Sequence, residues 1–592
     1  MARFRSVADK VRRSAPPVDP PAAPSADPKL LVGLSATPPA DEGWTAVELL
    51  ALGPAHAQDW AEVEIRAGSL AELRRALPWL VHAGRTPRLR VAVARTDRPR
   101  ALRPPALVGN RPVASALLTR KPLQVEVELA KPAAVAALVR ACLSPVEEIG
   151  RRHGAPGLRA AVADPAALSW TTGLPHVPLA REPDPADPLP PPDLVLRREQ
   201  TGLPPVDTAF CSPAGFRPDA AGFAELVAAP DGLLLQGPAG TLGTLDPLVG
   251  LTENHIRSLR EFAAVRVADA SAPGLSRVLS QLSCAGVPVC APHLTADLDE
   301  ELGPDLAARL RDLTPSQLED PLAREAWSVS TRRTALGRFS PDAYWRARQG
   351  DAGPTVSVVL ATRRPDLLSF ALAQVERQDW PRLEVVLVLH GAAADHPAVT
   401  AAAAALTRPL TVVEVPADVV FGRALQTGLA RCSGRLVTKM DDDDWYGVHH
   451  VTDLVQAHAH SGATLVGSSG YHLYVADADA TLRWTKNPTE AAATWVHGGT
   501  MLLARDDLTA LGGWPAVPVG EDAHLIRAVR ESGGWIYGIH DLGFLYYRGQ
   551  GHTWMPATGS QFWLDAEVPR AAGFAPPPQL DALPHPWVAR PG

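Results

Sequence analysis

The stretch Leu436–Gly447 reads Leu-Val-Thr-Lys-Met-Asp-Asp-Asp-Asp-Trp-Tyr-Gly, and it decides how the C-terminal part of the chain is interpreted. Its first five residues are apolar except for Lys439 and Thr438, which is typical of a buried strand. Four carboxylates follow at once, in the place where open α/β sheets bind their ligands. Because like charges packed this closely repel one another, a cation is expected among them. Oxygen-only ligands suit a hard divalent ion, Mg²⁺ or Mn²⁺, whereas the alternative is a solvated acidic turn.

Length and composition limit the class of protein. A chain of 592 residues is too long for one hydrophobic core, so several domains are expected. The formal net charge of −7 provides no basic surface for nucleic acid. The five cysteines are scattered without metal-type spacing, which favours a reducing compartment. There is no run of eighteen apolar residues and no signal-peptide core, so we expect a cytoplasmic protein without a transmembrane segment.

The N-terminal third contains no chemical motif. Residues 1–40 are rich in proline and alanine and are expected to form a disordered tail. The basic residues at its start leave open a peripheral association with anionic lipid at the inner face of the plasma membrane. Residues 41–180 alternate strand-like and helix-like runs, which indicates an α/β domain of unknown role. Residues 181–205 are a proline-rich stretch expected to act as a stiff linker.

Residues 206–340 form a second α/β segment. Its clearest feature is the run Leu279–Val289, a predicted helix that Gly286 stops before a short strand. This run resembles, weakly, the late part of the C-terminal half of GT-B glycosyltransferases. The resemblance implies a Rossmann-like domain in which the glutamate that commonly holds the donor ribose is replaced by Gln281. We therefore expect a degenerate or purely structural domain.

The C-terminal part alternates strands and helices regularly. Such alternation predicts an α/β fold with a doubly wound, mostly parallel sheet whose ligand site lies at the carboxyl ends of the strands. A proline-rich tail over 568–592 is expected to follow the domain. The predicted strands are 356–362, 383–389, 410–415 and 436–440, and the predicted helices are 366–378, 398–406 and 422–431.

Five ordered motifs carry a second and stronger resemblance. They are Val356–Thr362 with the following Arg-Arg-Pro, Ser433–Trp445 with its Asp-x-Asp, Gly498–Arg505 with the later Gly-Gly-Trp514, Gly520–Asp522, and His552–Trp554. In this order they resemble the GT-A-fold family 2 glycosyltransferases over about residues 354–564, and the domain is expected to span 354–567. The resemblance implies a GT-A domain that is preceded by Rossmann-like α/β domains.

The resemblance also implies roles for the acidic residues. Asp443 and Asp441 would hold Mn²⁺ or Mg²⁺, and Asp441 and Asp442 would contact the donor. His552 stands where the family sometimes has a further metal ligand, with an ordinary loop histidine as the alternative. Asp522 matches the general base, which takes the proton of the acceptor hydroxyl. A plain helix start is the alternative for this motif, because acidic residues suit the first turn of a helix.

Other candidates are less specific. Thr362, Arg364 and Arg423 are placed in the donor site, the arginines as partners of the diphosphate, with surface charges as the alternative. His390 stands where family members have an acidic residue that reads the nucleotide base. On the acceptor side we expect Glu521 and Trp514, although Trp514 fits a core position equally well.

The sequence thus predicts an inverting, metal-dependent glycosyltransferase. It would move a sugar from a nucleotide-sugar donor to the hydroxyl of a glycan or lipid-linked acceptor, in the synthesis of a cell-surface polysaccharide or glycoconjugate. Two alternatives stay open at this point: a nucleotidyltransferase of the same fold, and a non-catalytic scaffold of a glycan pathway. Because every motif with chemical meaning follows residue 354, we also expect the C-terminal domain to bind donor without the rest of the chain.

Overall fold

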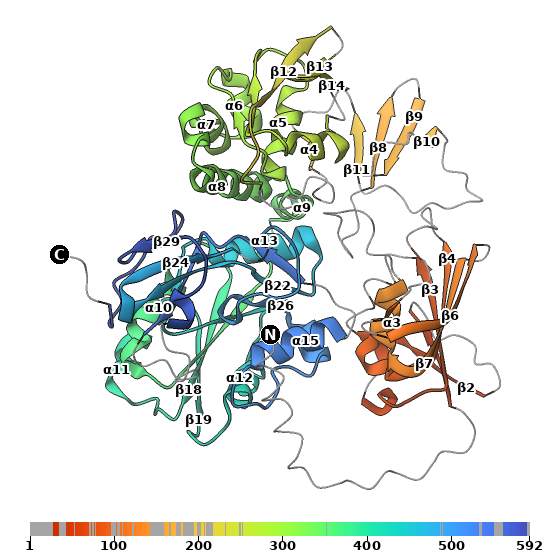
Figure 1. Cartoon of the computed structure of the whole chain (residues 1–592), viewed down its shortest axis with the longest axis vertical. Coiled ribbons are helices and arrows are strands. Elements are labelled where there is room, and N and C mark those ends of the chain that lie inside the picture. Colours follow the sequence, from red (N-terminus) through yellow and green to blue (C-terminus); the bar gives the residue numbers. More distant parts are fainter. Residues whose placement is uncertain are drawn as a thin grey trace.

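The computed structural model describes residues 28–34, 43–142 with gaps, four strands between 159 and 197, and 203–588 with gaps. The largest gaps in the last range are 209–216 and 550–560. The elements gather into separate α/β bodies, with the C-terminal body at the lower left of Figure 1. The predicted α/β class is confirmed. Among the described residues, no helix is both long and apolar enough to cross a membrane.

The first body is a seven-stranded sheet with the order β2-β1-β3-β4-β7-β6-β5. Its apolar side chains, such as Val63, Ile65 and Val91, are fully buried in one cluster. Its elements are β1 (Lys29–Gly33), β2 (Trp44–Glu48), β3 (Glu62–Ser69), β4 (Arg85–Arg95), β5 (Leu107–Val108), β6 (Arg111–Arg120), β7 (Leu123–Ala134) and α3 (Val135–Cys142). A small sheet follows, with β8 (Arg159–Asp164), β9 (Ala167–Thr172), β10 (Leu179–Ala180) and β11 (Leu194–Arg197).

The middle body is a five-stranded sheet with the order β14-β13-β12-β15-β16. Strand β15 pairs in parallel with β12 on one side and with β16 on the other. On the other half of the sheet, β13 pairs antiparallel with both β12 and β14. Rossmann-like pairing is therefore limited to half of this sheet. Its elements are β12 (Phe223–Ala229), β13 (Gly232–Gly237), β14 (Gly240–Leu245), β15 (Ala264–Val267), β16 (Val289–Cys290), α4 (Glu253–Leu259), α5 (Leu275–Ala285), α6 (Ala296–Leu302), α7 (Pro304–Asp312), α8 (Pro321–Phe339) and α9 (Pro341–Gln349).

Helix α5 ends where the sequence predicts. Gly286 closes it in the left-handed conformation, with φ at 70°, a conformation that glycine adopts without the steric cost of a Cβ atom. Gln281 on this helix is fully buried, and its amide oxygen accepts a hydrogen bond of 2.8 Å from the N–H of Leu251. The residue at the ribose-binding position of the GT-B resemblance therefore serves internal packing, in line with a structural domain.

The C-terminal body is built on an eight-stranded sheet with the order β19-β18-β17-β20-β26-β22-β27-β25. Strands β19, β18, β17 and β20 run parallel to one another, and β17 is buried along its whole length because helices cover both faces. The strands are β17 (Val356–Thr362), β18 (Leu383–His390), β19 (Leu410–Val415), β20 (Leu436–Met440), β22 (Leu465–Ser468), β25 (Ala491–Ala493), β26 (Leu502–Ala504) and β27 (Ile536–Ile539). The helices are α10 (Leu368–Glu376), α11 (Pro397–Ala405), α12 (Phe421–Leu429), α13 (His450–Ser461), α14 (Arg505–Ala510), α15 (Glu521–Glu531) and α16 (Gln561–Leu564).

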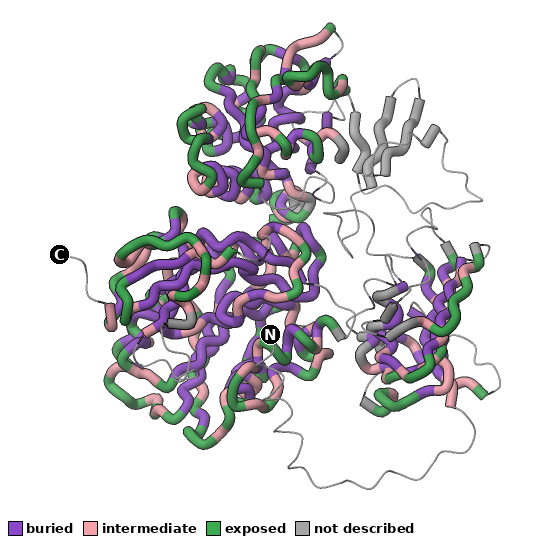
Figure 2. Tube along the Cα trace, in the orientation of Figure 1, coloured by how far each residue is buried: buried purple, intermediate pink, exposed green. Residues whose placement is uncertain are grey.

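A second sheet of this body, with the order β21-β28-β23-β24-β29, lies beside the first. Its strands are β21 (Trp445–Tyr446), β23 (Tyr471–Val475), β24 (Ala480–Trp484), β28 (Phe544–Arg548) and β29 (Arg570–Ala572). Because β21 directly follows the acidic turn, residues 441–444, this sheet fixes the far end of that turn. The turn is thus held between two sheets, and Asp442, Asp443 and Asp444 are buried. Figure 2 colours buried residues purple along the whole chain.

The predicted domain boundaries need correction at three places. Strand β1 lies inside the predicted N-terminal tail and pairs with β3. Strand β11 lies inside the predicted linker and pairs with β8. The predicted C-terminal tail contributes β29, and its residues 574–588 pack on Trp445 and Tyr547. In each case the proline-rich composition predicted a tail or linker, but the short apolar runs between the prolines still pack.

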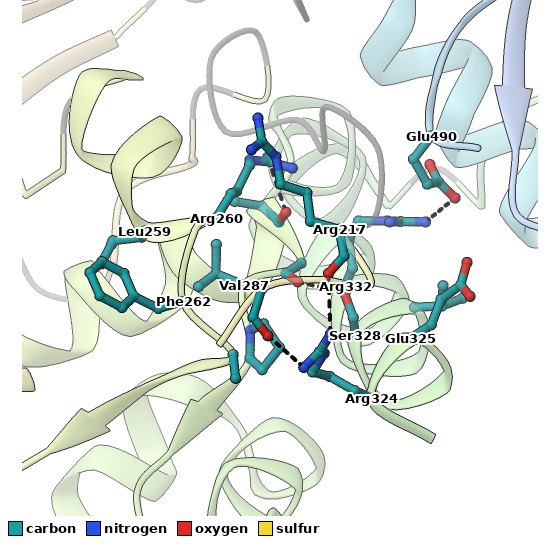
Figure 3. A pocket seen from close by; sticks show the side chains of 16 residues that line it. Arg217, Leu259, Arg260, Phe262, Val287, Arg324, Glu325, Ser328, Arg332 and Glu490 are labelled. Carbon is teal, nitrogen blue, oxygen red and sulfur yellow. Dashed lines mark hydrogen bonds and ion pairs between the residues drawn. The ribbon is translucent and has the colours of Figure 1, made fainter. Parts of the chain in front are cut away.

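Helix α8 lies inside the predicted domain 206–340 but also contacts the C-terminal domain. Its Arg332 pairs with Glu490 at 2.6 Å and its Arg333 pairs with Asp453 at 2.6 Å, and all four side chains are at most 10% exposed. Figure 3 shows the first of these pairs reaching across from α8. A third pair joins Glu325 to Arg483 at 2.7 Å. The C-terminal domain is therefore completed by α8, and a fragment that starts near residue 350 lacks its partners.

Candidate functional site

The acidic turn lies at the carboxyl end of β20, next to the carboxyl end of β17 in the sheet. The hydroxyl of Thr362, the last residue of β17, donates to Asp442. Arg364 pairs with Asp442, and its Nη1 lies 2.9 Å from Oδ2 of Asp443. Four residues predicted for one site are therefore connected by direct contacts, since neighbouring parallel strands deliver their ends to the same edge.

Lys439 connects the acidic turn to the start of α15. Its ammonium group lies 2.9 Å from Oδ1 of Asp441 and 3.3 Å from Oε1 of Glu521, and the lysine side chain is 6% exposed. Burial works against its charged form, but Asp441 and then Glu521 outweigh burial and raise the pKa of Lys439. Two motifs that lie 80 residues apart in the chain therefore share one buried cation.

Gly498 and Gly499 fill the space between these two motifs. A Cβ atom on Gly498 would lie 2.4 Å from Oδ2 of Asp522. A Cβ atom on Gly499 would lie 2.7 Å from Oδ2 of Asp441 and 2.9 Å from the hydroxyl of Tyr446. Only a residue without a side chain fits either position, so the Gly-Gly pair is what allows Asp441 and Asp522 to border the same backbone.

The surroundings shift the pKa values of the four carboxylates of the acidic turn in different directions. Burial, followed by the charge of Asp443, raises the pKa of Asp442 to about 6. Burial also raises the pKa of Asp443 and, more strongly, of Asp444. Burial opposes ionisation of Asp441 too, but Lys439 reverses the effect and lowers its pKa. The turn thus carries charge that its buried surroundings disfavour, which an added cation would stabilise.

The donor set of the turn fits a hard divalent ion. Oδ2 of Asp444 is buried without a hydrogen-bond partner among the described residues. This atom and Oδ2 of Asp441 both border Gly499, at 3.3 and 2.7 Å from the position of its Cβ. Carboxylate oxygens that face a small space are the ligands that Mg²⁺ and Mn²⁺ prefer. Within the described ranges no group of three His, Cys, Asp or Glu side chains is arranged to hold a metal.

Four predicted residues are not among these contacts. His390 bonds to the carbonyl of Val419 at 2.7 Å and to Arg363 at 3.1 Å. Arg423 is exposed on α12. Trp514 is 3% exposed and packs in a hydrophobic cluster, which agrees with the core position that the sequence left open. His552, the predicted further metal ligand, lies outside the described residues.

Other residues at the site were missed by the sequence analysis. The hydroxyl of Tyr446 accepts from the N–H of Asp441 at 2.8 Å and donates to the carbonyl of Gly499 at 3.0 Å. Nδ1 of His497 accepts from the N–H of Gly499 at 3.3 Å. His585 lies 3.2 Å from the carbonyl of Asp443. Tyr446 follows the acidic turn in the sequence and His497 precedes Gly498, so these motifs could have indicated both residues. His585 stands in a proline-rich stretch that contains no such motif.

A pocket of about 540 Å³ lies elsewhere, between the middle body and the C-terminal domain. Four arginines line it, as Figure 3 shows: Arg217, Arg260, Arg324 and Arg332. The guanidinium group of Arg324 donates to backbone carbonyls, including that of Ala220 at 3.0 Å. Of these arginines, Arg332 reaches the C-terminal domain through Glu490, and the acidic turn is not part of this pocket.

Comparison with known proteins identifies one family. Residues 357–503 match the model described as glycosyl transferase family 2. A comparison with curated proteins finds no match.

Solved structures also match part of the chain. A mannosyltransferase from Pyrobaculum calidifontis in complex with GDP-Man and Mn²⁺ is 22% identical, with 40% of this chain and 70% of that chain covered and a TM-score of 0.28. S. aureus TarS 1-349 in complex with UDP-GlcNAc is 14% identical, with 33% and 60% covered and a TM-score of 0.28. A second TarS structure has 14% identity, 33% and 36% coverage and a TM-score of 0.26. The chain thus spans less than two thirds of either TarS structure.

Proposed function

We propose, from the premise that residues 357–503 belong to glycosyl transferase family 2, that this chain is an inverting, metal-dependent glycosyltransferase. Its donor would be a nucleotide sugar and its acceptor a hydroxyl of a glycan or lipid-linked molecule. The observation that carries the proposal is the bridge formed by Lys439, which joins Asp441 to Glu521 beside Gly498 and Gly499. The acidic turn proposed for the donor and the carboxylate of Glu521 proposed for the acceptor would thereby lie in one site.

The reaction would be a single displacement. The acceptor oxygen forms a bond to the anomeric carbon while the bond from that carbon to the donor phosphate oxygen breaks, so the configuration inverts. Asp522 would take the proton of the acceptor hydroxyl as the new bond forms. A divalent ion held by Asp441 and Asp443 would neutralise the charge that develops on the leaving nucleoside diphosphate.

The chain's own residues would set the geometry for this step. Lys439 holds the start of α15, on which Asp522 stands, against the acidic turn. Arg364 holds Asp442 and Asp443 from the opposite side. Thr362 and Arg364 would lie next to the donor, because they end the strand beside the turn. Fixed positions matter here, since a misplacement of about 1 Å costs roughly 10²-fold in rate.

For the acceptor, we propose the aromatic side chains around His497 in place of Trp514. The ring of Tyr471 lies 5.3 Å from that of His497 and stacks on Trp484 at 6.0 Å with an interplanar angle of 5°. Trp484 and His497 are partly exposed, unlike Trp514. Aromatic rings of this kind offer a flat apolar surface with a polar edge, which suits a sugar.

The test is calorimetry of UDP- and GDP-sugars with Mn²⁺, on wild type, Asp443→Ala and the control Asp506→Ala. Asp506 is a carboxylate of the same domain whose side chain is 82% exposed. We expect wild type and Asp506→Ala to bind a donor only with Mn²⁺, and Asp443→Ala to lose that binding. Equal binding by Asp443→Ala would refute the metal assignment.

Two other outcomes would favour the alternatives. Release of pyrophosphate in place of a nucleoside diphosphate would identify a nucleotidyltransferase. A folded wild type that binds no nucleotide sugar of the panel would favour a scaffold in glycan assembly. The proposed context, synthesis of a cell-surface polysaccharide or glycoconjugate, rests on the family resemblance, and the proposed association with the inner face of the membrane rests on the basic residues at the start of the chain.

A further inference from the structure

The C-terminal segment 583–587 lies against the acidic turn, although its composition predicts a free tail. Three of its residues contact the turn or its neighbours. The carbonyl of Leu583 accepts from the indole N–H of Trp445 at 2.9 Å. Nε2 of His585 lies 3.2 Å from the carbonyl of Asp443. The ring of Trp587 lies 5.1 Å from the guanidinium carbon of Arg364. The segment thus contacts Asp443 of the turn and the neighbouring side chains of Trp445 and Arg364.

The hydrogen bonds of His585 fix its tautomer. Its Nδ1 accepts from the N–H of Trp587 at 3.1 Å, so that nitrogen carries no proton. Nε2 must then carry the proton, and it donates to the carbonyl of Asp443. The imidazole also stacks on Tyr547 at 4.8 Å with an interplanar angle of 22°. His585 therefore holds the backbone of Asp443, whose carboxylate is paired with Arg364.

Trp587 acts on the same residues through Arg364. Its ring faces the guanidinium group, a cation–π contact within the usual range of about 6 Å. Its indole N–H donates to Oδ2 of Asp366 at 3.3 Å, which keeps the ring in place. Arg364 in turn pairs with Asp442 and Asp443.

We infer that segment 583–587 is a positioning element of the donor site, in which Trp587 orients Arg364 and His585 fixes the main chain of Asp443. The inference rests on the proposed function, because it gives these contacts a purpose in holding Asp443 for the donor. Neither residue touches the reacting atoms; both act through the residues that do. The class of ligand concerned is the nucleoside diphosphate part of the donor with its divalent ion.

The experiment measures the affinity of full-length protein for UDP and GDP with Mn²⁺ by calorimetry, and the urea midpoint in parallel. We expect Trp587→Ala to bind the nucleotide roughly tenfold more weakly, about 1.4 kcal/mol. Trp587→Phe keeps a ring over Arg364 and should restore most of the affinity. Leu580→Ala is the matched control, because Leu580 is buried in the same cluster but contacts neither Arg364 nor Asp443 in any described interaction. It should lower the urea midpoint and leave the affinity unchanged.

Three outcomes would overturn the inference. One is a Trp587→Ala variant that binds nucleotide as tightly as wild type. Another is a loss of affinity in Leu580→Ala that matches the loss in Trp587→Ala, because the effect would then follow stability. If Trp587→Ala does not fold, Trp587→Leu keeps the apolar volume and removes the π face, and wild-type affinity in that variant contradicts the inference. A wild type that binds neither nucleotide would refute the proposed function, and the inference with it.

Discussion

Replacement of Arg332 by methionine should destabilise the C-terminal domain, although Arg332 belongs to helix α8. Arg332 and Glu490 are 8% and 3% exposed, and their atoms lie 2.6 Å apart. The other partners of Glu490 are neutral, namely the N–H of His540 at 3.1 Å and the hydroxyl of Tyr537 at 3.0 Å. Removal of the arginine leaves a buried carboxylate without a counter-charge, which costs about 3–5 kcal/mol.

Urea unfolding followed by tryptophan fluorescence measures this loss. The control is Arg346→Met, because Arg346 and its partner Asp342 are 21% and 45% exposed and such pairs are worth about 0–1 kcal/mol. The double variant Arg332→Met, Glu490→Gln removes both charges and should recover most of the stability. A loss below about 1 kcal/mol in Arg332→Met would refute the reasoning, and with it the conclusion that α8 completes the domain.

Two further predictions concern the site and its surroundings. Gly499→Ala should lower turnover about 10²-fold, because the new Cβ would lie 2.7 Å from Oδ2 of Asp441. The control Gly337→Ala should keep full activity, because its Cβ would have its nearest contact at 3.6 Å. Steady-state kinetics of both variants measure the difference. Burial, with the charge of Asp506, raises the pKa of Asp507 to about 6. The protonated carboxyl therefore stabilises the fold below about pH 4, and this stability is lost as the pH rises through about 6. Asp507→Asn should therefore raise the urea midpoint at pH 7.5 and leave it unchanged at pH 4, and an equal shift at both pH values would contradict the assignment.

The elements of the C-terminal sheet could be predicted from the sequence because their patterns are strong. Strand β17 is a run of β-branched and apolar residues that is buried on both faces. In the middle body, Gly286 likewise ends α5 as expected. The contact of Thr362 and Arg364 with Asp442 could also be predicted, since parallel strands bring their carboxyl ends together. In these places local pattern and tertiary structure agree.

The remaining parts depend on contacts between distant residues, which a single sequence does not display. Arg332 and Glu490 are separated by 158 positions, so nothing in either local pattern announces their pairing. Trp587 stands in a proline-rich stretch that reads as a tail, yet its ring lies over Arg364. Trp514 fitted two roles equally from its pattern, and only its burial separates them.

The role of Asp522 is the central claim, and the turnover of Asp522→Asn tests it most directly. Asparagine keeps the shape of the side chain and suits the start of a helix as well as aspartate does, so the variant should fold normally. The measurement is the release of nucleoside diphosphate at saturating donor and acceptor, together with the dissociation constant for the donor. We predict that turnover falls by roughly 10²–10⁴ while donor affinity stays within about twofold of wild type. Turnover like that of wild type, under the same saturating conditions, would contradict the account and remove Asp522 from catalysis.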